Sequence, residues 1–141
     1  MINGGNYITG SRSDLNEKEI IKAIISKSSN EINRFSRNGV KIQSFFFEIS
    51  EDDNYKDLFS GFVFDTNGPF PYSEELDEIL SSLHFAGIIG SINPVLKDYT
   101  INISDKYFKT ISNLVGKQEL EKIEILSKKF SEKLGKKSFS V

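Results

Sequence analysis

The chain has 141 residues, a mass of 16.0 kDa and a formal net charge of −2, so one domain with a single hydrophobic core is expected. It contains no cysteine, which excludes disulfides, thiolate metal sites and cysteine nucleophiles. No apolar run approaches the roughly 18 residues that a membrane helix needs, and the first residues lack the pattern of a signal peptide. We therefore expect a cytoplasmic protein.

The charge is distributed unevenly along the chain. Residues 1–90 carry 8 Lys or Arg against 14 Asp or Glu, whereas residues 91–141 carry 10 against 6, so the front is acidic and the tail basic. Such an asymmetry is typical of a surface that faces a partner. An unbiased solvated surface is the alternative interpretation.

Residues 1–13 are rich in Gly, Asn and Ser, and we expect them to be flexible. A first helix is predicted over residues 15–37. Its predicted apolar stripe has the spacing of one helical face and consists of Ile21, Ile25, Ser28, Ile32 and Phe35. The Asn38-Gly39 pair is a typical helix C-terminus.

An antiparallel hairpin is predicted next, from strands at residues 40–49 and 58–64. Both strands are apolar on both faces, with Phe45 and Phe47 on one face of the first strand. The first helix would cover one side of this hairpin. The other side requires either a further element of the chain or another protein, so we expect Phe45 and Phe47 to contact a partner.

Residues 68–103 have the order of a winged-helix element. Ser73 is the expected N-cap of a helix that Gly87 ends. Two strands then follow, at Ile88-Ile89 and at residues 99–103, joined by a turn at Asn93-Pro94.

Two further helices are predicted, over residues 104–115 and 117–134, with residues 135–141 fraying at the end. The predicted fold class is therefore α+β: an N-terminal helix, a β-hairpin, a winged-helix-like element with a two-stranded wing, and two C-terminal helices. One domain would extend from residue 14 to residue 134.

The chain offers few residues for catalysis. His84 is its only histidine, so a triad or a histidine metal site lacks partners, and no Gly-x-Ser-x-Gly motif is present. We expect no enzymatic activity, no cofactor and no metal. An enzyme with an unrecognised site lined by Glu48, Asp65 or His84 is a further hypothesis.

The charges on the helix of the winged element indicate which kind of partner it would bind. A DNA-reading helix directs its exposed N-terminal face toward the duplex. Four carboxylates occupy this face here and would repel phosphate, namely Glu74, Glu75, Asp77 and Glu78. We expect this acidic face to meet either solvent or a basic protein surface.

The last predicted helix is basic on its polar side. Four of its lysines are candidate nucleic-acid contacts, namely Lys122, Lys128, Lys129 and Lys133. They alternate with glutamates, and a mixed charged face is usually solvated. Docking of its apolar stripe on a partner helix is a third interpretation.

The stretch GPFPYSEELDEILSSLHFAGIIGSINP resembles two groups of small bacterial proteins. One is the accessory middle component of ABC-three-component conflict systems, including Lamassu-type antiphage defence. The other is a phage-associated antitoxin group. The resemblance rests on Gly68-Pro69, residues 71–73, the leucines at 76, 80 and 83, and residues 87–89.

The first resemblance implies a non-catalytic accessory subunit of a multiprotein antiviral defence complex. Such a subunit would bind an SMC-like ATPase, an effector, or both. The alternative is a winged-helix DNA-binding transcriptional regulator or antitoxin, which would contact DNA through the basic last helix.

Overall fold

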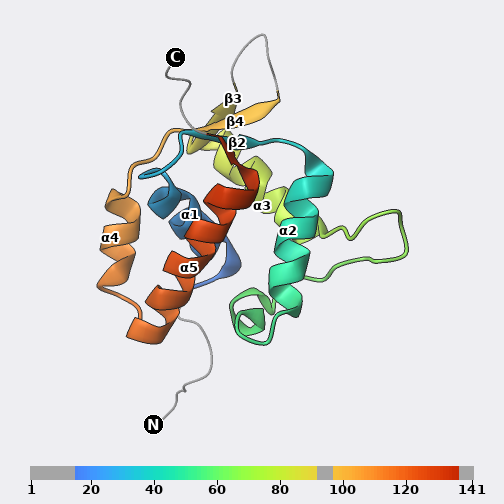
Figure 1. Ribbon diagram of the computed structural model, residues 1–141, viewed down its shortest axis with the longest axis horizontal. Helices are drawn as coiled ribbons and strands as arrows, with labels where there is room; N and C mark the ends of the chain where they lie inside the picture. Colours follow the sequence, from blue (N-terminus) through green and yellow to red (C-terminus); the bar gives the residue numbers. More distant parts are fainter. Residues whose placement is uncertain (1–14, 92–96, 137–141) are drawn as a thin grey trace.

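The computed structural model describes residues 15–91 and 97–136, which form a mixed α+β fold (Figure 1). Its elements in chain order are α1 (Glu17–Ser28), β2 (Arg34–Ser36), α2 (Gly39–Glu51), the 3-10 helix η1 (Lys56–Phe59), α3 (Glu74–Phe85), β3 (Ile89–Ser91), β4 (Asp98–Ile101), α4 (Lys106–Ser112), α5 (Lys117–Leu134) and β5 (Gly135–Lys136). The strands form one antiparallel sheet in the order β3-β4-β2-β5. The sheet lies at one end of the helices in Figure 1.

The first helix is shorter than predicted, because α1 ends at Ser28 rather than near residue 37. Asn16 and Glu19 form a reciprocal capping box at its start. Beyond the helix, Phe35 lies in β2 directly opposite Tyr99 of β4. The spacing that suggested a longer helix therefore continues into a strand, because pairing with β4 satisfies the backbone there.

The predicted hairpin over residues 40–49 and 58–64 is wrong. Residues 39–51 form helix α2, which Asn38 caps by accepting a hydrogen bond from the backbone N–H of Lys41. The buried hydrophobic residues of α2 follow the i, i+3, i+4, i+7 spacing of one helical face and are Ile42, Phe45, Phe46 and Ile49. Burial of this face outweighs the strand propensity of consecutive aromatic residues.

The predicted helix and the strand pair that follows it are confirmed. Gly87 ends the α3 region with φ at 81°, a conformation that favours glycine. Strand β3 then pairs with β4, with Ile89 opposite Ile101. The predicted turn at Asn93-Pro94 and the predicted flexible residues 1–13 lie outside the described residues.

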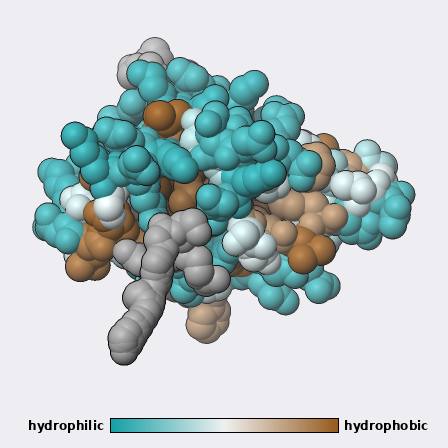
Figure 2. All heavy atoms as spheres, turned by 90° about the horizontal axis from the view of Figure 1, so that it is seen from below, coloured by the Kyte–Doolittle hydropathy of each residue, from teal (hydrophilic) through white to brown (hydrophobic). Residues whose placement is uncertain are grey.

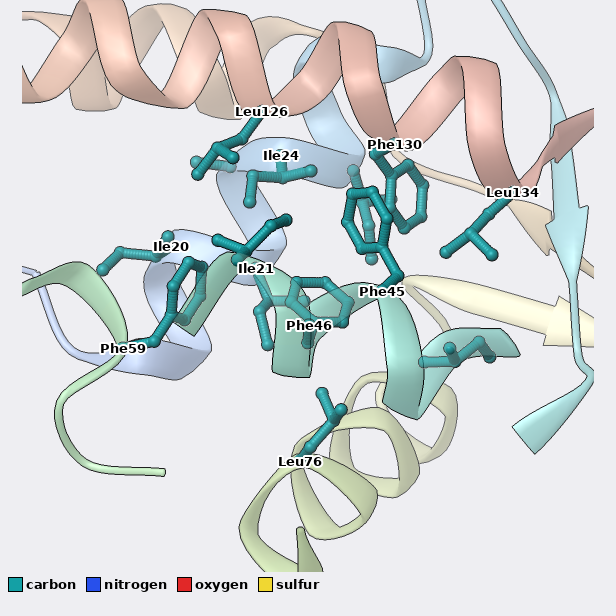
Figure 3. Close-up of a cluster of buried hydrophobic side chains, with 14 of the residues drawn as sticks. Ile20, Ile21, Ile24, Phe45, Phe46, Phe59, Leu76, Leu126, Phe130 and Leu134 are labelled. Carbon is teal, nitrogen blue, oxygen red and sulfur yellow. The ribbon is translucent and has the colours of Figure 1, made fainter. Parts of the chain in front are cut away.

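The core lies where α1, α2 and α5 meet (Figure 3). Phe130 of α5 packs edge to face with Phe35 and Phe45, at centroid distances of 4.9 and 5.9 Å. Phe46 contacts Phe45 and Phe59 in the same way, at 5.1 and 5.8 Å. Such aromatic pairs add stabilisation beyond the area that they bury.

The C-terminal helices agree with prediction for α5, which spans the expected residues 117–134, whereas α4 is shorter than predicted. The expected fraying from residue 135 is wrong for its first two residues, because Gly135 and Lys136 pair with β2. The Lys136 ammonium lies 2.8 Å from a carboxylate oxygen of the buried Asp98. Residues 135 and 136 therefore form an edge strand of the sheet.

Candidate protein-binding face of helix α3

Helix α3 is anchored to α2 by a buried side-chain amide. Gln43 accepts a hydrogen bond from the Ser73 N–H at 2.8 Å and donates one to the Ser73 carbonyl at 3.1 Å. The Ser73 hydroxyl in turn accepts from the N–H of Leu76 at 3.2 Å and caps α3. The Gln43 amide, the Ser73 backbone and the Ser73 hydroxyl lie in the interior, and their hydrogen bonds fix the position of the start of α3.

The opposite side of α3 faces solvent along its whole length. Its exposed residues are Glu74, Asp77, Glu78, Ser81 and Phe85. At 100° per residue they cover one side of the helix, away from the buried leucines. We call these five residues the α3 face. It begins with three carboxylates and ends with an aromatic side chain that is 96% exposed.

Glu75, one of the four carboxylates that were predicted to contact a partner, makes hydrogen bonds within the protein. Its carboxylate accepts hydrogen bonds from the Val63 N–H at 3.1 Å and from the Ser73 hydroxyl at 2.9 Å. These bonds, that from Val63 first, lower the pKa of Glu75 below its ordinary value. Glu75 therefore links the loop before α3 to the helix and is half-buried.

The carboxylates of the α3 face create a negative field at Tyr72. Desolvation and then the charge of Asp77 raise the pKa of the Tyr72 hydroxyl, with weaker contributions from Glu74 and Glu78. A basic partner surface would find a complementary potential here.

Three of the four predicted nucleic-acid lysines line grooves that also contain carboxylates. Lys129 and Lys133 line a groove together with Glu48 and Asp52 of the α2 region. Lys128 lines a different groove, with Glu31 and Glu124 among its other residues. Lys122 also lies on α5 and is half-buried.

The carboxylates beside these lysines affect how well the lysines could bind nucleic acid. A phosphate approaching either groove would meet carboxylates as well as ammonium groups, which weakens nucleic-acid affinity.

Phe45 and Phe47 were predicted to contact a partner, but Phe45 lies in the core at 8% exposure. Phe47 is half-buried and packs edge to face against Phe64, with ring centroids 5.3 Å apart. It lines a groove of about 450 Å³ with Phe59, Phe62 and Phe64. Figure 2 shows hydrophobic residues in several separate patches on this face of the molecule, one of them on the side where the loop between η1 and α3 projects in Figure 1.

His84 stands at the C-terminal end of α3. Its Nε2 lies 3.2 Å from the Ser91 hydroxyl oxygen, and its ring packs edge to face against Tyr99 at a centroid distance of 5.6 Å. The two other residues of the enzyme hypothesis have different neighbours. Glu48 shares its groove with lysines, and the backbone of Asp65 pairs with that of Tyr72.

Within residues 15–91 and 97–136, no group of three or more His, Cys, Asp or Glu side chains is placed to hold a metal ion. Over the same residues, no helix combines the length and the apolar composition required to cross a membrane.

The sequence interpretation missed Phe85. The 4-3-4 spacing from Glu74 through Glu78 and Ser81 to Phe85 indicates one helical side, and this pattern could have identified it. Comparisons of the chain with models of protein families, with curated proteins and with solved structures found no match.

Proposed function

We propose that this protein is a non-catalytic adaptor subunit that binds a partner protein through the α3 face. The observation that carries the proposal is the combination of three exposed carboxylates with a fully solvated Phe85 on one side of a rigidly anchored helix. Protein interfaces use aromatic residues as anchors inside a polar rim. The partner would therefore present a basic surface around an apolar pocket.

The order of the elements supports a winged-helix arrangement for this module. Strand β2 lies between α1 and α2, helix α3 follows, and the β3–β4 pair comes after α3, with β4 between β3 and β2 in the sheet. In DNA-binding members of this architecture, the helix equivalent to α3 enters the major groove. Carboxylates on this helix oppose such a use and favour a protein partner.

The resemblance of residues 68–94 to accessory components of antiphage systems extends the proposal. The adaptor would act in the bacterial cytoplasm, within a defence complex that contains an SMC-like ATPase and an effector. Its α3 face would bind one of these subunits. An adaptor of this kind positions other subunits and needs no catalytic residues of its own.

The test is co-expression with each product of the neighbouring genes, followed by purification and measurement of the dissociation constant. Replacing Glu74, Asp77 and Glu78 together by Lys, or Phe85→Ala alone, should weaken binding at least about tenfold, since anchors contribute about 2 kcal/mol or more. The matched control replaces three exposed carboxylates of α5, Glu121, Glu124 and Glu132, by Lys. Unchanged affinity of both α3-face variants for a neighbouring product that binds the wild-type protein would contradict the proposal.

The competing function, DNA binding, has the helix-and-strand arrangement in its favour. It predicts salt-dependent binding to the DNA upstream of its own gene, lost when Lys128, Lys129 and Lys133 are reversed in charge. If the α3-face carboxylates repel DNA, their replacement by Lys should strengthen binding instead of weakening it. The two functions therefore predict opposite effects of the same variant.

A further inference from the structure

A second polar site lies at the other end of α3, where this helix meets β3. Side chains from three parts of the chain converge there on one oxygen atom. The Ser91 hydroxyl oxygen accepts a hydrogen bond from Arg37 Nη1 at 2.5 Å and lies 3.2 Å from His84 Nε2. All three side chains are at least partly exposed, so a ligand can reach them.

The guanidinium of Arg37 is held in place by its surroundings. It stacks on the ring of Tyr99, with 4.6 Å between the guanidinium carbon and the ring centroid. The Arg37 backbone N–H also donates to the Lys97 carbonyl at 2.9 Å. A cation positioned in this way loses little conformational entropy when it binds a ligand.

Among the described residues, no carboxylate pairs with the positive charge of Arg37, since no Asp or Glu of this part of the chain lies within ion-pair distance of its guanidinium. The buried carboxylate of Asp98 instead pairs with Arg34 and Lys136. Adjacent residues of a strand point to opposite faces, so Asp98 and Tyr99 lie on different sides of the sheet.

We propose that Arg37, His84 and Ser91 form a binding site for a phosphoryl group. Arg37 lies between β2 and α2, His84 in α3 and Ser91 in β3, so their donors reach the site from three parts of the chain, and phosphate oxygens accept charge-assisted hydrogen bonds from such donors. The Arg37 guanidinium supplies paired donors and the Ser91 hydroxyl supplies another. The His84 ring lies in the last turn of α3, and a ring N–H is a further donor.

The proposal is independent of the α3 face, since it uses none of the same residues. The phosphoryl group would belong to a small phosphorylated molecule or to a nucleic-acid backbone. Both present the same oxygen atoms to the site, and the experiment below separates them.

Because His84 is the only histidine, its imidazole signals in an NMR spectrum report on this site alone. We expect inorganic phosphate to shift these signals in a saturable manner, since the bound anion would lie beside the imidazole ring. Chloride at the same ionic strength should not reproduce the effect. A short DNA duplex forms the second arm, and a response at much lower phosphate-group concentration would identify nucleic acid as the source.

Arg37→Gln should weaken phosphate binding about tenfold or more, as expected for loss of hydrogen bonds to a charged group. The matched control is Lys41→Gln, which removes one exposed positive charge on neighbouring α2 and leaves the three site residues intact. Circular dichroism establishes that both variants are folded. A shift that chloride reproduces, or one that Arg37→Gln leaves unchanged, would overturn the proposal.

Discussion

Phe46 and Phe85 are the same residue type in opposite surroundings. Phe46 is 1% exposed and packs against three other aromatic rings, whereas Phe85 is 96% exposed at the end of α3. The hydrophobic effect stabilises the first position and leaves the second available for a partner. This contrast separates residues that maintain the fold from residues that the proposed function requires.

Phe46→Ala should lower the free energy of unfolding by about 3–5 kcal/mol, because it removes a buried ring and leaves a cavity. The matched variant Phe85→Ala should change it by no more than about 0.5 kcal/mol, since the lost ring contacts solvent. Urea unfolding followed by circular dichroism measures both. Equal destabilisation by the two substitutions would place Phe85 in the core and remove it from the α3 face.

Glu75 makes stability depend on pH in a defined direction. The Val63 N–H and the Ser73 hydroxyl lower its pKa in the folded protein below the ordinary value of 4.5. Its contribution is therefore complete above about pH 4.5 and is lost as the pH falls through the folded-state pKa.

Glu75→Gln should accordingly lower the urea midpoint at pH 7, and its difference from the wild-type protein should shrink toward pH 3. The control is Glu78→Gln, on the exposed side of the same helix, which should not show this loss of difference. If the urea midpoints of the wild-type protein and Glu75→Gln differ by the same amount at every pH, the Glu75 carboxylate does not stabilise the fold in the way described.

At the scale of elements, α3 owes its position to Ser73 and Gln43. The Ser73 hydroxyl satisfies a backbone N–H in the first turn and also donates to Glu75. The Gln43 amide holds the Ser73 backbone from α2. The N-cap was predictable from the sequence, whereas Gln43 was not, because its partner is 30 residues away.

Ser73→Ala should lower the free energy of unfolding by about 1 kcal/mol or somewhat more, as expected for loss of an N-cap. Ser81→Ala is the matched control, since Ser81 is exposed in the middle of the same helix and alanine favours helix. Thermal unfolding compares the two. A destabilisation by Ser81→Ala as large as that by Ser73→Ala would argue against the cap.

Residues 39–51 show why the secondary structure of a segment can be predicted wrongly from its composition. Consecutive phenylalanines have high strand propensity, and the prediction followed it. The i, i+3, i+4, i+7 spacing from Ile42 to Ile49 was equally visible in the sequence. The segment forms a helix because its apolar face is buried against α5 and η1. Phe45, which was predicted to lie on the surface, is therefore in the core.

At the scale of the whole molecule, the last described strand is joined through the sheet to a strand near the start of the fold. Strand β5 follows α5 directly and pairs with β2, which follows α1. Gly135 makes this closure possible, because a Cβ there would lie 2.5 Å from the Ser131 carbonyl oxygen and 2.6 Å from a methyl group of Ile32. Backbone and core atoms surround it, so they cannot easily move away.

Gly135→Ala should therefore destabilise the protein by about 1–3 kcal/mol through overpacking. Gly39→Ala is the control. A Cβ at Gly39 meets nothing within 4 Å, and alanine is a better helix former, so this variant should be neutral or slightly stabilising. If chemical denaturation shows that both variants are as stable as the wild-type protein, Gly135 is not packed against Ser131 and Ile32 as described.

The sequence by itself determined the α+β class, the bounds of α3 and α5, the strand pair after α3 and the acidic character of the α3 face. These features depend on caps, glycines and periodicity within a few residues of one another. Only the tertiary structure decided that residues 34–36 join a sheet, that Phe45 is buried, that α5 lysines share grooves with carboxylates of other segments and that Arg37 and His84 both lie beside Ser91. Those outcomes depend on contacts between distant segments, whose burial and pairing outweigh local propensity.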